Sequence, residues 1–127
     1  MLKIECCGLT STQTKQIIDK QISEKEFAGQ VERLTDPDMI AARRVKKGDV
    51  DFYLGSCQTG GGGSLATAIM VLGYGNCLTI SRQGKLPSPQ EIRHQLYAGH
   101  HKAFGYVTEH TDALVPVLLQ VLIDKAE

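Results

Sequence analysis

The chain has 127 residues, 42% of them hydrophobic, and its 14 basic and 14 acidic side chains balance. A chain of this length is expected to fold as one domain, residues 1–127, with a hydrophobic core of its own. Because neither sign of charge forms a long run, the composition argues against a nucleic-acid partner and against an anionic membrane surface.

Short apolar or β-branched runs alternate with longer segments of helical period, which indicates βαβ units and a parallel sheet. The strands predicted in this way are residues 2–7, 31–34, 51–55, 76–80 and 103–107. We therefore predict a three-layer, doubly wound α/β fold with about five parallel strands in the flavodoxin-like order 2-1-3-4-5.

The segments that follow the strands have the features of helices. The predicted helices are residues 11–22, 37–47, 65–72, 89–99 and a last one from about 109. Thr35-Asp36 is expected to cap the second helix, with Pro37 at its first position and Gly48 after its end. A capping box starting at Ser88 predicts the start of the fourth. The third helix is apolar on nearly all sides, which is typical of a helix buried against a sheet.

Two features of the chain bear on its location. The N-terminal segment has no basic start followed by a long apolar run, so no secretory signal is predicted and we expect a cytoplasmic protein. The most apolar stretch, residues 113–123, is interrupted by Pro116 and Gln120. It is shorter than the roughly 20 residues of a membrane span, so we expect a core helix instead.

The cysteines are expected to be free thiols in a reducing compartment. They are Cys6, Cys7, Cys57 and Cys77, and no CxxC pair occurs among them. This spacing does not match a zinc site, and we expect no structural metal. Successive residues of a strand face opposite sides of a sheet, so the two neighbouring cysteines of the first strand are not expected to act together.

The segment GSCQTGGGGS, residues 55–64, joins the third predicted strand to the next helix and contains four successive glycines. Ligands of open parallel sheets bind at the carboxyl ends of the strands, where the strand order reverses. Backbone without Cβ atoms can present successive N–H groups to a ligand, and the following helix adds the positive end of its dipole. These features favour the binding of an anionic ligand at this segment.

The predicted strand order brings the loop after the first strand beside this glycine-rich segment, so the two loops are expected to line one crevice. The residues expected to bind the ligand are Gly8, Thr10, Gly55, Gly60, Gly61, Gly62, Gly63 and Ser64. The alternative is a flexible surface loop or a tight turn that only packs against a neighbour. The glycine spacing matches neither a phosphate-binding P-loop nor a dinucleotide fingerprint, so ATP, GTP and NAD are disfavoured and no cofactor is expected.

Cys57 is the best candidate for a nucleophile or base, because a thiol just ahead of a helix N-terminus has a lowered pKa. The alternative is a small hydrophobic side chain packed under the loop. Thr59 and Ser64 can donate to a ligand oxygen or cap the helix. His110 is predicted at the same edge of the sheet and is a candidate acid or base, or else a solvated helix-end residue.

The runs YLGSCQTGGGGSLATAIMVLGYGNCLTIS and KAFGYVTEHTDALVPVLL resemble the uncharacterised bacterial YhfU-type family, and the likeness covers most of the chain. Membership implies a cytoplasmic α/β protein whose gene lies among genes of carbohydrate and amino-acid metabolism. The resemblance implies no activity.

The shorter segment CQTGGGGSLATAI resembles the glycine-rich loop of the ribose-5-phosphate isomerase B and galactose-6-phosphate isomerase group. The resemblance implies that Cys57 removes a substrate proton, that the amides of 60–63 hold the enediolate, and that Thr59 assists ring opening. That group carries an Asp-His pair just after its first strand, where this chain has CCGLT at residues 6–10.

The segment CCGLTST resembles the phosphocysteine loop of sugar phosphotransferase IIB subunits, which implies Cys7 as a phosphate acceptor. We favour binding of a small anionic metabolite, a sugar phosphate or a related acid, with isomerase-type proton transfer by Cys57 as an extension. The alternatives are a non-enzymatic ligand sensor or assembly subunit of a metabolic pathway, and a phosphocysteine carrier. We also expect a homodimer, the commonest assembly.

Overall fold

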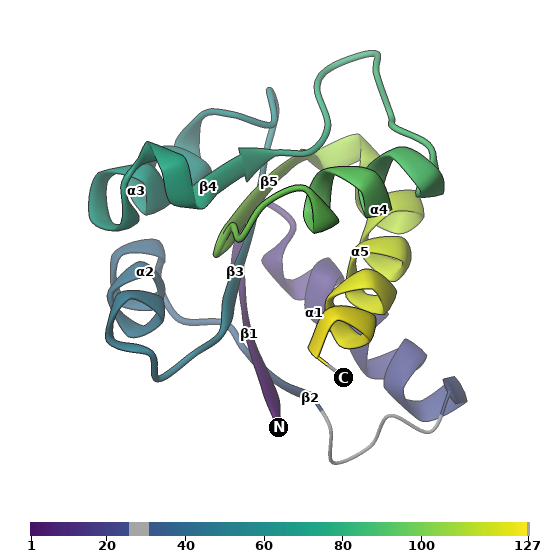
Figure 1. Ribbon diagram of the computed structural model, residues 1–127, viewed down its shortest axis with the longest axis horizontal. Coiled ribbons are helices and arrows are strands. Elements are labelled where there is room, and N and C mark those ends of the chain that lie inside the picture. Colours follow the sequence, from purple (N-terminus) through teal and green to yellow (C-terminus); the bar gives the residue numbers. More distant parts are fainter. Residues whose placement is uncertain (26–30, 127) are drawn as a thin grey trace.

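The protein contains a five-stranded parallel sheet covered by helices on both faces, as seen in a computed structural model that describes residues 1–25 and 31–126 (Figure 1). The strands are β1 (Leu2–Gly8), β2 (Val31–Leu34), β3 (Phe52–Cys57), β4 (Cys77–Thr79) and β5 (Ala103–Val107). The predicted α/β class with parallel strands is confirmed. β3 runs two residues further than predicted, so Cys57 is its last residue.

The order of the strands is β2-β1-β3-β5-β4, so the predicted order 2-1-3-4-5 is wrong for the last two strands. All five residues of β5 are buried, whereas β4 has only three residues and one of them is buried. An interior strand of a parallel sheet is covered on both faces, which suits the apolar β5, and the short, partly polar β4 suits an edge.

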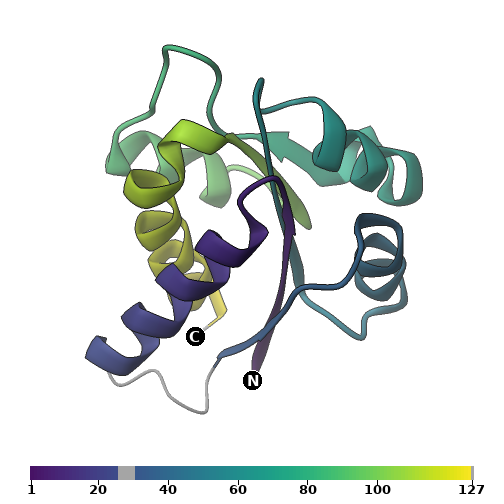
Figure 2. The ribbon, with the colours of Figure 1, turned by 180° about the vertical axis from the view of Figure 1, so that it is seen from behind.

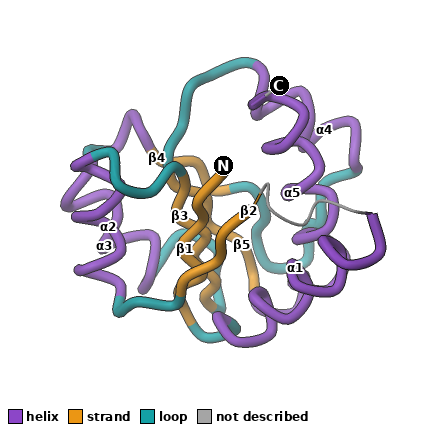
Figure 3. The backbone as a smooth tube through the Cα atoms, turned by 90° about the horizontal axis from the view of Figure 1, so that it is seen from below, coloured by secondary structure: helices purple, strands orange, loops and turns teal. Residues whose placement is uncertain are grey.

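The helices form one layer on each side of the sheet. They are α1 (Ser11–Lys25), α2 (Asp38–Lys47), α3 (Gly63–Leu72), α4 (Pro89–Tyr97) and α5 (Thr111–Ala126). α2 and α3 cover one face, and α1, α4 and α5 cover the other (Figures 2 and 3). β1 and β3 are neighbours, and the helices that follow them lie on opposite faces, so the reversal lies where it was predicted.

Each layer has a core of its own. The larger core contains Cys6 and the inward residues of α1, α4 and α5, among them Leu114, Leu118, Val121 and Leu122 of the stretch predicted as a core helix. The smaller core, under α2 and α3, contains Cys7. The two cysteines therefore face opposite sides of the sheet, as strand alternation predicts.

The predicted helix signals had different outcomes. α4 begins with the predicted capping box, in which Ser88 and Glu91 bond each other's backbone N–H groups around Pro89. For α2, the glycine stop is confirmed, but Pro37 is itself the N-cap residue and no side chain caps the helix. Asp36 instead pairs with Arg44, 2.8 Å away, so its carboxylate serves a different contact.

α3 packs against the sheet, as predicted, although part of its apolar surface is exposed. Leu65 and Ala68 face the core, but Met70 is 73% exposed. Within the described residues, no helix is both long enough and apolar enough to cross a membrane.

Glu5 is a fully buried carboxyl group in the middle of β1, on the side of the sheet that α2 covers. Its Oε1 accepts the N–H of Asp36, and Arg44 lies 3.9 Å from Oε2. Burial and contact with the Asp36 carboxylate raise the pKa of Glu5 from 4.5 to about 7, although Arg44 opposes the shift. The bond from the Asp36 N–H to Glu5 therefore joins β1 to the segment that precedes α2.

Replacing Glu5 tests whether its carboxyl group is protonated in the folded protein. Because the folded-state pKa of Glu5 is raised, its protonated form contributes stability that is complete below pH 4.5 and is lost as the pH rises through about 7. Glu5→Gln keeps a neutral donor and acceptor, so we expect the variant to match the wild type near pH 5. At pH 8.5 it should be more stable, by about 1–3 kcal/mol. Urea unfolding at both pH values measures this, and an equal difference at the two would contradict it.

Candidate functional site

The loop after β1 lies beside the carboxyl end of β3, as predicted, and bonds to it directly. Gly8 pairs with Ser56 in the sheet and takes φ +88°, and a Cβ at Gly8 would overlap the Ser56 carbonyl. The N–H of Leu9 donates to that carbonyl, at 3.1 Å. The N–H and hydroxyl of Thr10 bond the Ser56 Oγ at 2.9 and 2.6 Å.

These contacts belong to a row of hydrogen-bonded hydroxyl groups that no sequence motif indicates. Beyond Ser56 and Thr10, the Thr111 Oγ1 lies 3.0 Å from the Thr10 Oγ1 and donates to the Thr108 carbonyl at 2.7 Å. The row joins β1, β3 and the start of α5. One available signal was strand alternation, which places Ser56 on the opposite face of β3 from Cys57.

The glycine-rich segment turns sharply at Gly60, which has φ +86°. A Cβ at this position would overlap the carbonyl of Ser81, which follows β4. The Gly60 carbonyl in turn occupies the space that a side chain at Gly105 of β5 would need. The Ser81 Oγ accepts the N–H of Val107 at 2.9 Å. The first glycine of the run is therefore packed between the ends of β4 and β5, and only a glycine fits there.

This turn surrounds the Cys57 sulfur with hydrogen-bond donors. The N–H of Gly60 donates to the Sγ at 3.0 Å, and the Thr59 hydroxyl lies 3.6 Å from it. The Thr59 Oγ1 also accepts the N–H of Gly62 at 3.2 Å. Burial raises the pKa of Cys57, but the Thr59 hydroxyl and the N–H groups of Gly62, Thr59 and Gly60 lower it by more, so the pKa lies below its ordinary value.

The other thiols have the opposite character. Burial raises the pKa of Cys6 to about 12, and it raises the pKa of Cys7 and of Cys77 as well. All four cysteines are free, as predicted. Because the thiolate is the reactive form of a cysteine, Cys57 is the thiol suited to chemistry near neutral pH. Within the described residues, no three side chains of His, Cys, Asp or Glu are grouped as metal ligands.

The remaining predicted ligand-binding residues divide into two groups. Gly61 and Gly63 are exposed, and within the described part of the chain no backbone or side-chain acceptor bonds their N–H groups or that of Ser64. Gly55 and the Ser64 side chain are instead buried in a contact with each other. Their position gives them a packing role.

His110 lies at the carboxyl end of β5, on a short 3₁₀ turn, Thr108–His110, that precedes α5. Its Nδ1 is buried and has no hydrogen-bond partner within the described residues. The neighbouring Thr111 contacts Thr10, so His110 belongs to the predicted edge of the sheet.

Comparison with known proteins identifies the family. Residues 2–122 match the model of a family described as a protein of unknown function, DUF2620. The chain belongs to this family. Proteins from Escherichia coli strain K12 and Shigella flexneri, each described as "Uncharacterized protein YhfU", are 36% identical over 122 residues, which cover 96% of this chain and 99% of theirs. The predicted YhfU-type membership is confirmed.

Solved structures of ribose-5-phosphate isomerase B share the fold of this DUF2620 protein. The enzyme from Giardia lamblia matches with a TM-score of 0.67 and 14% identity, covering 97% of this chain and 94% of that one. The enzyme from Thermotoga maritima matches with a TM-score of 0.63 and 12% identity, covering 96% and 86%. At such identities the likeness shows the fold alone, but it extends over nearly the whole chain.

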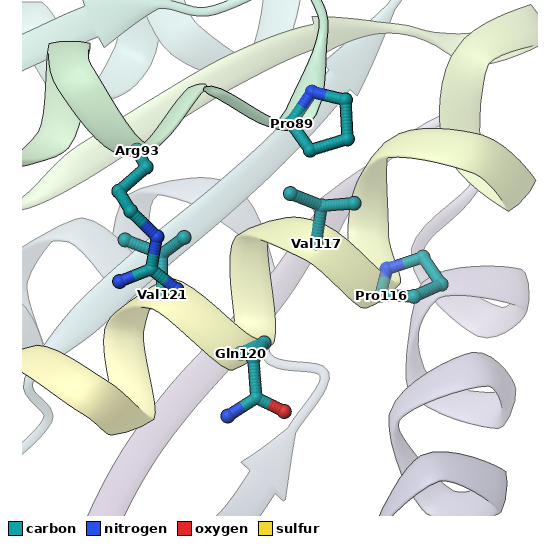
Figure 4. A pocket seen from close by; sticks show the side chains of 6 residues that line it. All are labelled: Pro89, Arg93, Pro116, Val117, Gln120 and Val121. Atoms are coloured by element: carbon teal, nitrogen blue, oxygen red, sulfur yellow. The ribbon is translucent and has the colours of Figure 1, made fainter. Parts of the chain in front are cut away.

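A hollow of about 290 Å³ lies between α4 and α5. Figure 4 shows Pro89 and Arg93 of α4 on one side of it and Val117, Gln120 and Val121 of α5 on the other. Its lining residues are Pro89, Arg93, Pro116, Val117, Gln120 and Val121. None of the predicted site residues is among them.

Two glycines with positive φ allow a matched test of the packed turn. Gly60 has φ +86° and its Cβ position is filled by the Ser81 carbonyl, whereas Gly84 has φ +71° and open space around it. Gly84→Ala is expected to cost about 1 kcal/mol from backbone strain alone. Gly60→Ala is expected to cost at least about 3 kcal/mol, because strain and overlap add. Denaturant unfolding measures both, and equal losses would refute the close packing at Gly60.

The donors around the sulfur can be tested through Thr59. Thr59→Val keeps the shape of the side chain but removes the hydroxyl between the Cys57 Sγ and the Gly62 N–H. We expect the pKa of Cys57 to rise, and its alkylation by iodoacetamide at pH 7 to slow several-fold, roughly 3–10 times. Thr67→Val, on α3, should leave the rate unchanged. The rate follows from mass spectrometry of the Cys57 peptide, and an unchanged rate in the first variant would contradict the assignment.

Proposed function

We propose that the protein binds a small anionic metabolite of the sugar-phosphate class at residues 57–63 and that the Cys57 thiolate transfers a proton between two neighbouring carbons of it. The observation that carries the proposal is the Cys57 sulfur, which accepts the Gly60 N–H at 3.0 Å and has a lowered pKa. The fold shared with ribose-5-phosphate isomerase B supports the same class of ligand.

The proposed step needs no oxidant or reductant. The thiolate takes the proton from the carbon beside a carbonyl group, and the electron pair moves onto the carbonyl oxygen to form an enediolate. The same thiol then returns the proton to the former carbonyl carbon, while the neighbouring hydroxyl passes its own proton to the former carbonyl oxygen and becomes the new carbonyl. The exposed N–H groups of Gly61 and Gly63 are donors available for the enediolate oxygens, and such donors stabilise a developing oxyanion by several kcal/mol.

The charge pattern around the loop supports an anionic ligand. Residues 52–81 contain no charged side chain and no histidine. The first charges after them are Arg82 and Lys85, on a turn closed by two backbone hydrogen bonds, and the described residues offer neither an ion-pair partner. Ser81, which contacts Gly60, directly precedes this turn. Arg82 and Lys85 are therefore two cations on the β4 side that are available to the anionic group of a ligand whose reacting carbons lie at Cys57.

The neighbourhood of the first strand limits the chemistry. Just after the first strand, where the isomerase group carries an Asp-His pair, this chain has Thr10, which is bonded to Ser56. Neutral hydroxyls do not supply the acid and base that open a sugar ring, so we propose an open-chain substrate. A phosphocysteine role for Cys7 is not supported, because this thiol is buried, donates toward the Asp36 carbonyl and has a raised pKa.

Protection of Cys57 from alkylation tests the binding site. We expect an open-chain sugar phosphate such as ribulose 5-phosphate to slow the reaction of Cys57 with iodoacetamide, and ribulose without phosphate not to slow it. Gly61→Val should fold, since Gly61 has ordinary φ and its Cβ position is 3.4 Å from the nearest atom, but the added side chain should abolish protection. Gly75→Val, at an open position outside the loop, is the control. Protection that survives in Gly61→Val would remove the loop from the site.

Proton transfer is tested separately from binding. In ²H₂O the wild type should exchange the hydrogen beside the carbonyl of the bound sugar phosphate for deuterium, as seen by nuclear magnetic resonance, and Cys57→Ser should not. Protection without exchange would favour the ligand-sensor alternative. The homodimer stays a prediction, which light scattering on the purified protein tests.

A further inference from the structure

Tyr53 and Ser64 form a buried contact between β3 and the first turn of α3. The Tyr53 hydroxyl donates to the Ser64 carbonyl at 2.7 Å, and the Ser64 Oγ lies 2.7 Å from the same phenol oxygen. A phenol has one proton, and the carbonyl takes it, so the Ser64 hydroxyl is the donor in the second bond. Both side chains are buried.

Two features define this contact. Burial raises the pKa of Tyr53 far above its ordinary value, so the phenol keeps its proton around neutral pH. Gly55 lies two residues further along β3, and a Cβ there would be 2.6 Å from the Ser64 Oγ. The missing side chain at Gly55 therefore admits Ser64 to the surface of the strand.

The contact closes the glycine-rich segment at its far end. Cys57 ends β3 and holds the near end through the Gly60 N–H, whereas Ser64 is the second residue of α3. Between them the backbone carries no side chain from Gly60 to Gly63, and two of these glycines have positive φ. Apart from its ends, such a segment is restricted by the packing of Gly60 and by the bond from the Gly62 N–H to the Thr59 hydroxyl.

We propose that Tyr53 and Ser64 are positioning residues that hold the first turn of α3 against β3, so that the N–H groups of the glycine-rich segment point at the Cys57 sulfur. A role of these two residues in catalysis rests on the proposed function. Their effect on the geometry around the Cys57 thiol does not depend on it. It also assigns Gly55 and Ser64 to the support of the site rather than to the ligand.

The test is the pH midpoint of Cys57 alkylation by iodoacetamide, followed by mass spectrometry in the full chain without any ligand. We expect Tyr53→Phe and Ser64→Ala each to raise this midpoint by about one pH unit, which slows alkylation about tenfold below the midpoint. In the double variant we expect the rise seen in Tyr53→Phe rather than the sum. Tyr53→Phe already removes both bonds of the phenol oxygen, whereas Ser64→Ala leaves its bond to the Ser64 carbonyl.

Tyr106→Phe is the matched control. Tyr106 is also buried, but its hydroxyl bonds Thr14 of α1 at 2.6 Å, in the other layer. Its loss should lower the melting temperature without moving the midpoint. Equal midpoints in Tyr53→Phe and Tyr106→Phe, or a double variant equal to the sum of the single ones, would overturn the proposal. If Tyr53→Phe does not fold, Ser64→Ala alone decides, since it removes one hydroxyl and keeps the bond from Tyr53 to the Ser64 carbonyl.

The outcome separates this inference from the proposed function. If the midpoint moves as expected but no sugar phosphate protects Cys57 in the wild type, the positioning role stands and the proposed ligand is wrong. If sugar phosphates protect Cys57 and the midpoint does not move in either variant, the ligand stands and the positioning role is wrong.

Discussion

The hydrogen bond from the Gly60 N–H to the Cys57 sulfur depends on a backbone that no residue other than glycine can adopt at that place. The chain turns back on itself there, with its amide toward the thiol and its Cβ position against the Ser81 carbonyl. A sulfur with two or three donors around it holds negative charge more readily than one packed among carbon atoms. The contrast with Cys6, Cys7 and Cys77 follows from this arrangement.

Strand and helix positions could be predicted from the sequence because they depend on local pattern. β2 and β5 have their predicted bounds, and the capping box at Ser88 marks the start of α4. The pairing of β5 with β3 could not be predicted in the same way. The pairing depends on which of the two short strands, β4 or β5, buries more apolar surface when it is covered on both faces. That in turn depends on the positions of α3, α4 and α5.

The site was predictable in its location and less so in its contacts. That Cys57 follows a strand and precedes a helix is visible in the sequence, and so is the proximity of the loop after β1. Ser56, Tyr53 and Ser81 were missed because their roles arise from tertiary contacts with partners that are distant in the sequence. Ser56 bonds Thr10, which is 46 positions away, Tyr53 bonds Ser64, which is 11 away, and Ser81 bonds Val107, which is 26 away. No motif marks such pairs, and strand alternation indicates only the face on which each side chain lies.

The placement of β5 between β3 and β4 also bears on how the molecule assembles. The turn at Gly60 rests on Ser81 and Gly105, so its shape requires a strand that is synthesised some 45 residues later and then inserted between two earlier ones. During synthesis the thiol leaves the ribosome without its donors. The lowered pKa of Cys57 is therefore acquired only once β5 has taken its place in the sheet.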